Sequence, residues 1–129
     1  MNIPGELKYT ENDEWVAVEE NIGIIGITDY AQDQLSDIVY VEMVVEEGET
    51  VDAGDICASV ESVKAAADVY MPVSGMIMET NEALADAPET VNNDPYGDAW
   101  MVKVNLSDPS ELNKLLDSEA YLKLIAERE

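Results

Sequence analysis

One lysine, Lys64, is the residue of this sequence best placed to carry chemistry. The chain has 6 Lys and Arg residues, 29 Asp and Glu residues and no His. Lys64 is the only positively charged side chain between Lys8 and Lys103, and it stands in the segment Glu61-Ser62-Val63-Lys64-Ala65. A lysine amine can be acylated to an amide, or it can form a Schiff base when burial in a pocket lowers its pKa.

The neighbours of Lys64 favour a modified lysine over a catalytic one. A lysine that only adds solubility usually stands among polar residues, whereas the small apolar residues Ala65–Ala67 follow Lys64. Small side chains leave the ammonium group accessible to a modifying enzyme and leave room for an attached arm to move. An exposed turn lysine without a special role is the ordinary alternative, and the three alanines are equally compatible with a turn of helix.

No other set of residues forms a recognisable catalytic or metal site. The lack of His removes the usual general base and the commonest metal ligand, which leaves open only a carboxylate site for Mg²⁺ or Ca²⁺. Asn92–Asp98 does not have the spacing of an EF-hand loop, so we predict no metal site there. Cys57 lies in an apolar run without nearby cations, which predicts a packed small hydrophobe. We therefore expect a protein that is not itself an enzyme.

The formal net charge of −23 excludes several kinds of partner. Nucleic-acid binding needs clustered cations, and an anionic membrane surface would repel this chain. No apolar run approaches the roughly 20 residues that span a bilayer. The first residues lack the features of a signal peptide, and a single cysteine fits a reducing compartment, so we expect a cytoplasmic protein. The length predicts one domain over 1–129.

The elements that must position Lys64 are predicted to be mainly β-strands. Short apolar runs rich in β-forming residues alternate with turn signals, a pattern that favours a sandwich or barrel over βαβ units. A strand–turn–strand unit flanks Lys64 on each side, as a quasi-symmetric β-fold would require. The predicted strands are 15–19, 22–27, 38–45, 56–61, 69–73, 76–79 and 99–104.

Helices are predicted only at the periphery. Thr28 has the character of an N-cap, and Asp29 with Gln32 resembles a capping box, which predicts a short helix near 29–35. Asp108 followed by Pro109 begins a second helical signal, and Ser118 begins a third, so we predict C-terminal helices near 109–127. Residues 81–93 show little pattern beyond a possible turn of helix.

The segment Glu61-Ser62-Val63-Lys64-Ala65 resembles the lipoylation motif of the glycine cleavage system H-protein family. The similarity extends over roughly residues 7 to 125, and the ordered combination of short matches makes it specific. The other matching segments are Tyr9-Thr10, Asp13 to Val16, Gly26 to Asp33, Asp37 to Glu42, Pro72 to Gly75, Asn81 to Leu84, Val91-Asn92, Asp94 to Gly97 and Trp100.

The resemblance implies a fold and a carrier function. The family fold is a lipoyl/biotinyl-type flattened β-barrel of two quasi-symmetric antiparallel sheets, here one domain with a helical C-terminal extension and with Lys64 at a hairpin tip. Lipoic acid would form an amide with Lys64 and change the formal charge to about −24. By motif position, Glu14 and Asp68 are candidates for lining the cleft that would receive the lipoyl arm after an aminomethyl group has been attached to it. The sequence departs from the family where His is usual, at Asp13 and near Gln34.

The resemblance also implies the partners of the carrier. Glycine decarboxylase (the P protein) would load the arm with an aminomethyl group, and the tetrahydrofolate-dependent aminomethyltransferase (the T protein) would unload it. Dihydrolipoamide dehydrogenase (the L protein) would reoxidise the arm, and a lipoyl ligase or transferase would attach it. We expect the carrier to be a monomer because it must visit several enzymes.

The sequence also allows other functions for this chain. A lipoyl domain of a 2-oxoacid dehydrogenase would have Asp before the lysine, and a biotin carrier would have Met on both sides; here Val63 and Ala65 flank Lys64. An H-like protein that donates lipoyl groups to other complexes would share the same attachment site. An unmodified acidic binding module is the alternative from a different class of protein.

Overall fold

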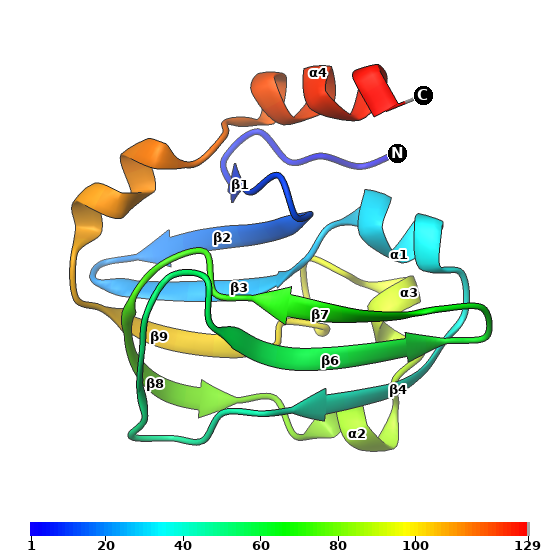
Figure 1. The fold of residues 1–129 in the computed structure, drawn as a ribbon, viewed down its shortest axis with the longest axis horizontal. Helices are drawn as coiled ribbons and strands as arrows, with labels where there is room; N and C mark the ends of the chain where they lie inside the picture. The colour runs from blue at the N-terminus through cyan, green and yellow to red at the C-terminus, as the bar shows by residue number, and fades with distance from the viewer. Residues whose placement is uncertain (129) are drawn as a thin grey trace.

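The structure is a computed structural model that describes residues 1–128, and it consists of two antiparallel sheets with short helices around them (Figure 1). The larger sheet has six strands in the order β1-β2-β3-β9-β8-β5, and the smaller one has three in the order β4-β6-β7. The strands are β1 (Lys8–Tyr9), β2 (Glu14–Glu19), β3 (Ile22–Ile27), β4 (Ile38–Met43), β5 (Thr50–Val51), β6 (Ile56–Ser62), β7 (Ala66–Tyr70), β8 (Gly75–Thr80) and β9 (Val102–Leu106). The predicted mainly β fold with two antiparallel sheets is confirmed, although the sheets do not close into a barrel.

The helices lie at the periphery, as predicted. They are α1 (Asp29–Leu35), α2 (Ala83–Asp86), α3 (Thr90–Asn93), the 3₁₀ helix η1 (Pro109–Lys114) and α4 (Ser118–Arg128). The Thr28 hydroxyl caps α1 by accepting a hydrogen bond from the backbone N–H of Ala31, and the amide of Gln32 donates to Asp29. None of the helices in residues 1–128 is long and apolar enough to cross a membrane.

Several predicted elements differ from the structure. The strand expected at 99–104 begins at Val102 and ends at Leu106, the strand expected at 38–45 ends at Met43, and β1 and β5 were not predicted. The strand expected at 69–73 is displaced, because β7 begins at Ala66 and ends at Tyr70. Pro72 has no N–H for a sheet ladder, so the chain leaves the sheet before it. Residues 81–93, where at most one turn of helix was expected, form the two short helices α2 and α3. Ala66 and Ala67 lie in strand β7, so these alanines do not form the turn of helix that their sequence also allowed.

The main hydrophobic core lies between the two sheets. Val16 and Ile25 of the larger sheet contribute to it, as do Val60 and Val69 of the smaller sheet, and all four are almost completely buried. Because successive side chains of a strand point to opposite faces, Trp15 faces away from this core. It lies across Gly26, where a Cβ atom would come within 2.8 Å of the indole ring.

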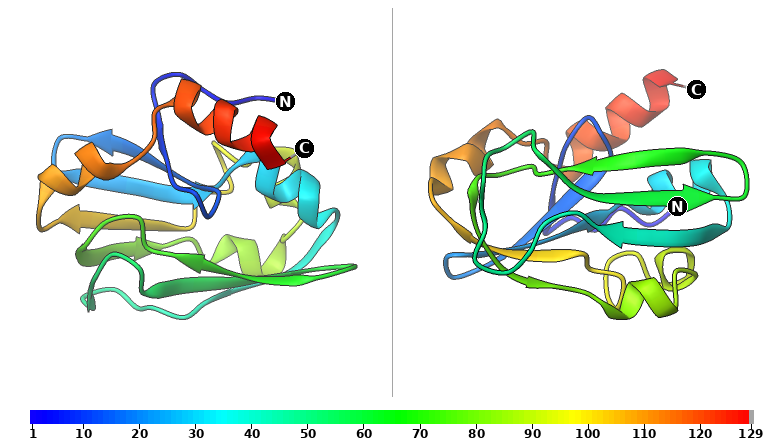
Figure 2. Two further views of the ribbon diagram at one scale, coloured as in Figure 1. Left: turned by 45° about the horizontal axis from the view of Figure 1, so that its top comes forward. Right: turned by 60° about the horizontal axis from the view of Figure 1, so that its bottom comes forward.

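A second cluster covers the opposite face of the larger sheet. Its buried members include Tyr9, Trp15, Tyr30, Tyr121 and Ile125. The rings of Tyr9 and Tyr121 are stacked with their centroids 4.7 Å apart. Figure 2 shows that α4 and the N-terminal segment lie on the side of β2 that faces away from β6 and β7. The second cluster therefore attaches the C-terminal helix to the sheet that carries Glu14.

Candidate functional site at the hairpin tip and its cleft

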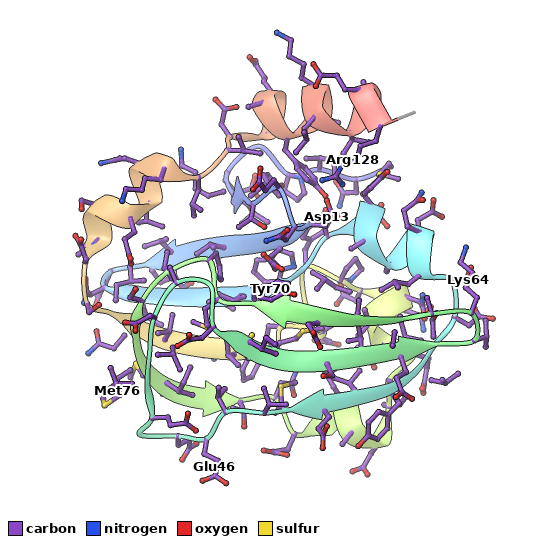
Figure 3. The ribbon with its side chains drawn as sticks, in the orientation of Figure 1. Asp13, Glu46, Lys64, Tyr70, Met76 and Arg128 are labelled. Carbon is purple, nitrogen blue, oxygen red and sulfur yellow. The ribbon has the colours of Figure 1, made fainter. Side chains whose placement is uncertain are left out.

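Lys64 lies at the tip of the hairpin that joins β6 to β7. The connection consists of residues 63–65, and both Val63 and Lys64 are exposed. Figure 3 shows Lys64 at the far end of this hairpin, away from the body of the protein. Among residues 1–128, Lys64 makes no ion pair. The structure therefore presents the amine to solvent.

Ser62 fixes the shape of the hairpin tip. Its hydroxyl oxygen accepts hydrogen bonds from the backbone N–H groups of Lys64 at 3.2 Å and Ala65 at 3.0 Å. The backbone N–H of Ser62 donates to the carbonyl of Ala65 at 2.7 Å, and that of Val63 donates to the carbonyl of Asp37 at 3.0 Å. A serine can satisfy turn N–H groups in this way because its side chain is short and polar. The attachment-motif residues Glu61, Ser62, Val63 and Ala65 thus shape the strand end and turn that hold Lys64.

Glu14 is a buried carboxylate at the start of β2, with an exposed fraction of 1%. The hydroxyl of Thr10 donates to one of its oxygens at 2.6 Å, and the backbone N–H of Tyr70 donates to the other at 3.1 Å. Burial raises the pKa of Glu14 to about 7, the two hydrogen bonds oppose this rise, and the negative charge of Asp13 adds to it. Glu14 can therefore exist in either protonation state near neutral pH.

A pocket of about 170 Å³ brings Glu14 and Asp68 together beside β7. Its other walls come from the Asn12–Asp13 turn, from β3 and β6, and from α1, where Gln34 and Leu35 line it. Asp68 makes its own hydrogen bond with the hydroxyl of Ser59, at 3.4 Å, rather than with Glu14. Lys64 and Asp68 are four residues apart, and a strand advances about 3.3 Å per residue, so the pocket lies within about 13 Å of the lysine along the hairpin.

A larger pocket of about 690 Å³ shares Glu14 as part of its wall. It lies between β7 and the C-terminal elements, and its lining includes Tyr70, Pro72, Leu115 and Leu124. Glu14 thus stands between two cavities, one beside the hairpin and one beneath α4. Sequence reasoning did not predict the second cavity, because its walls come from segments about 50 residues apart in the chain.

Several residues of the site were missed by sequence reasoning. Thr10 donates to Glu14, and its hydroxyl oxygen also accepts from the backbone N–H of Glu14. Asp13 was noted only as part of a matching segment and as the replacement of a family histidine; it accepts hydrogen bonds from Tyr121 and Arg128 of α4. The separation of more than 100 residues left no local signal for these contacts.

Cys57 is a packed residue of the main core, as predicted. It is completely buried, and burial raises the pKa of its thiol to about 12. Within residues 1–128, no group of three or more His, Cys, Asp or Glu side chains is arranged to hold a metal ion.

Comparison with known proteins gives one consistent result. A model of the glycine cleavage H-protein family matches residues 7–128. The glycine cleavage system H protein of Carboxydothermus hydrogenoformans is 51% identical over 125 residues, which cover 97% of this chain and 95% of that protein. The crystal structure of a glycine cleavage system H protein from Mycobacterium marinum is similar with a TM-score of 0.88 and 36% identity, and the match covers 96% of this chain and 99% of that one.

These matches extend over nearly the whole chain, including the hairpin with Lys64 and the strand with Glu14. Both the sequence similarity and the structural similarity agree with the two-sheet fold described above. The chain therefore belongs to the glycine cleavage H-protein family, the lipoyl carriers of the glycine cleavage system, which are not themselves catalytic.

Proposed function

We propose that Lys64 is the residue of this chain that carries lipoic acid, and that the pocket beside β7 receives the loaded arm. The observation that supports this most directly is the position of Lys64, exposed at the tip of a two-stranded hairpin whose turn Ser62 holds in place. The deprotonated Nζ of Lys64 attacks an activated lipoyl carbonyl, an amide bond forms, and the activating group leaves. The exposed tip gives a modifying enzyme access from both sides.

The residues around the hairpin fit the arm that the family carries. When attached, lipoic acid would supply a disulfide that can take up an aminomethyl group and release it again. Glu14 and Asp68 provide carboxylates for a cationic amine. Val69 and Leu35 give the pocket apolar walls that limit the access of water. The ionised carboxylate of Glu14 would pair with such an amine, and this pairing would lower the pKa of the carboxyl.

Mass spectrometry tests the attachment. Wild type, Lys64→Arg and Lys114→Arg are incubated with lipoate, ATP and a lipoate ligase, and their intact and peptide masses are measured. We expect one lipoyl unit on the Lys64 peptide in wild type and in Lys114→Arg, and none in Lys64→Arg. Lys114 is a matched control because it is also exposed but lies outside the hairpin. The proposal fails if folded wild type gains no lipoyl unit while the ligase modifies an established substrate.

The partners follow from the carrier role. We propose that the chain is loaded by the P protein, unloaded by the T protein and reoxidised by the L protein, acting as a monomer. An H-like donor of lipoyl groups to other complexes would use the same lysine, so assays with the three purified partners separate the two roles. A chain that stays unmodified in the mass experiment would instead be an acidic binding module. Residence in the cytoplasm stays a prediction from the sequence.

A further inference from the structure

Asp13, the residue immediately before Glu14, connects the site to the C-terminal helix. Its carboxylate accepts a hydrogen bond from the hydroxyl of Tyr121 at 2.9 Å and forms an ion pair with Arg128 at 2.7 Å. Tyr121 and Arg128 both belong to α4. We call these three residues the Asp13 cluster; Figure 3 shows Asp13 and Arg128 side by side below the helix.

The backbone around Asp13 is also held in an unusual conformation. Asp13 has a φ of 70°, in the left-handed region that residues other than glycine seldom adopt. Its carbonyl accepts from the backbone N–H of Thr28, and the Thr28 hydroxyl shares a hydrogen bond with Tyr121 at 2.7 Å. Arg128 donates a further hydrogen bond to the carbonyl of Glu11. The turn that leads into Glu14 is therefore tied both to the start of α1 and to α4.

The cluster uses charges that are scarce in this chain. Arg128 is the only arginine, and its pair with Asp13 is one of two ion pairs within residues 1–128. The side chains of Arg128 and Asp13 are exposed by only 32% and 21%, so water screens this pair less than it screens a typical surface pair. The Arg128 guanidinium also lies 5.6 Å from the ring centroid of Tyr30.

Helix α4 contributes to the wall of a cavity that borders Glu14. Leu124 of α4 and Glu14 line the same large pocket, so α4 forms one wall of the cavity that borders Glu14 on the side away from the hairpin. If α4 moved outward, this cavity would open further and more water would reach Glu14. The charged groups that face the two pockets are Glu11, Asp13, Asp68, Lys114, Lys123 and Glu127.

We propose that Asp13 is a positioning residue, which, through Tyr121 and Arg128, holds α4 in place as a wall of the cavity beside Glu14 and holds the Thr10–Glu14 turn in place. The cluster thereby limits the access of water to the Glu14 carboxyl and keeps it directed between Thr10 and Tyr70. Its use in holding a loaded arm rests on the function proposed above, whereas the positioning of Glu14 does not.

The test measures the pKa of Glu14 in the unmodified protein by following its carboxyl carbon by NMR from about pH 4 to pH 9. The variants are Arg128→Gln and, as a matched control on the same helix, Lys123→Gln, which has no contact with Asp13. The direction of the change in the Glu14 pKa shows whether α4 has moved or whether only the charge of Arg128 has been lost. Movement of α4 lets water reach Glu14 and lowers its pKa, whereas loss of the Arg128 charge alone leaves Asp13 unpaired and raises it.

We expect the pKa of Glu14 to fall by about one unit or more in Arg128→Gln, and to stay unchanged or rise slightly in Lys123→Gln, which only removes a positive charge from the wall of the large pocket. A rise or no change in Arg128→Gln would overturn the proposal, because α4 would then remain in place without the pair. Tyr121→Phe keeps the ring stacked on Tyr9 but removes the hydroxyl that donates to Asp13. It provides the same measurement with the same expected direction if Arg128→Gln does not fold.

A second readout connects the cluster to the arm. Lipoylated and loaded wild type, Arg128→Gln and Lys123→Gln are separated from glycine decarboxylase, and the release of formaldehyde and ammonia by hydrolysis is followed. We expect hydrolysis to be several-fold faster in Arg128→Gln alone. If Lys64 is never lipoylated, the proposed function fails while the NMR experiment still decides the role of Asp13. If wild type is loaded but all three proteins hydrolyse equally fast, the cluster does not protect the arm.

Discussion

Glu14 places a buried carboxyl group in the wall of the pocket beside β7. A buried carboxylate normally needs a partner charge, because transfer from water to a medium of low dielectric constant penalises the ionised form. Glu14 has only hydrogen-bond donors, the Thr10 hydroxyl and the Tyr70 N–H, and its pKa rises to about 7. An incoming cationic amine would supply the missing charge. The proposed function therefore predicts that a cation binds here more tightly than a neutral group of the same size.

Glu14→Gln should change how stability depends on pH. The folded protein disfavours ionised Glu14, so this residue lowers the free energy of unfolding of wild type as pH rises from about 4.5 to about 7. The loss is at most on the order of 3 kcal/mol, since one pKa unit corresponds to about 1.4 kcal/mol. We therefore expect Glu14→Gln to gain stability relative to wild type across this range. Urea unfolding at several pH values measures it.

The exposed Glu11→Gln is the control for this prediction, because it removes one negative charge beside the same turn without removing a buried group. Its unfolding free energy should run parallel to that of wild type between pH 4.5 and pH 7. Parallel curves for Glu14→Gln as well would show that the buried carboxyl is not penalised in the folded state.

Individual site residues differ in how far the sequence could predict them. The position of Lys64 at a hairpin tip was predictable from the family motif and the strand–turn–strand pattern around it, and the burial of Cys57 from its apolar run. Asp13 was not, since its partner Arg128 lies 115 residues away and no pattern links an aspartate to one of the last residues of the chain. Charge pairs between distant segments depend on packing that local sequence does not encode.

The hairpin β6–β7 is the element that presents Lys64, and Ser62 determines the shape of its tip. Ser62→Ala removes the acceptor for the N–H groups of Lys64 and Ala65. Because these groups are exposed and water can replace the hydroxyl, we expect a loss of at most about 1 kcal/mol in unfolding free energy. The looser tip should, however, be lipoylated several-fold more slowly by the ligase at limiting enzyme concentration.

Ser59→Ala is the control for the hairpin, because Ser59 lies on the same strand and its hydroxyl bonds to Asp68 rather than to the turn. It should be lipoylated at the wild-type rate. Equal rates for Ser62→Ala and wild type would mean that the ligase does not depend on a preformed turn.

Strands β8 and β9 lie so close together at Gly75 that no side chain larger than that of glycine fits there. A Cβ atom at this position would lie 2.1 Å from the backbone carbonyl oxygen of Asn105, which cannot move without disrupting the sheet. We expect Gly75→Ala to lower the free energy of unfolding by about 2 kcal/mol or more. Gly5→Ala, whose Cβ would have no neighbour closer than 3.9 Å, should change it by less than about 0.5 kcal/mol. Chemical denaturation compares the two variants.

Strand positions were easier to predict than strand ends. The run 22–27 was predicted with its observed bounds, because an apolar β-forming run is flanked by a turn on one side and a helix cap on the other. The run 69–73 was displaced, since apolar residues continue past the end of β7 into a buried segment that is not strand. An apolar run indicates that the residues are buried. Buried residues can continue past the point where the hydrogen bonds between strands end, so the run does not fix the end of the strand.

The whole molecule shows which features of a β-fold local patterns leave undetermined. The pairing of β3 with β9, almost 80 residues later in the chain, places the last strand in the middle of the larger sheet. Turn signals predict neighbours that are close in sequence, such as β2 with β3 or β6 with β7. The order of distant strands depends on the packing of the complete core, and the sequence analysis did not predict it.

The net charge of −23 affects stability and association in opposite ways as salt is added. Self-repulsion destabilises a compact acidic protein, and salt screens it. Salt also screens the two ion pairs in residues 1–128, but two attractive pairs are outnumbered by the repulsion among 29 acidic side chains. We therefore expect the melting temperature at pH 7 to rise by several degrees between about 0.05 M and 1 M NaCl. Over the same range, binding to partners through basic patches should weaken.

Measurement near the isoelectric point separates charge screening from a general effect of salt. The sequence pI is about 4.1, so at pH 4.5 the chain carries little net charge and NaCl has little repulsion to screen. The rise in melting temperature should then be much smaller than at pH 7. An equal rise at both pH values would mean that NaCl acts by strengthening apolar burial, as excluded salts do. In that case self-repulsion would contribute little to the stability of the folded chain at pH 7.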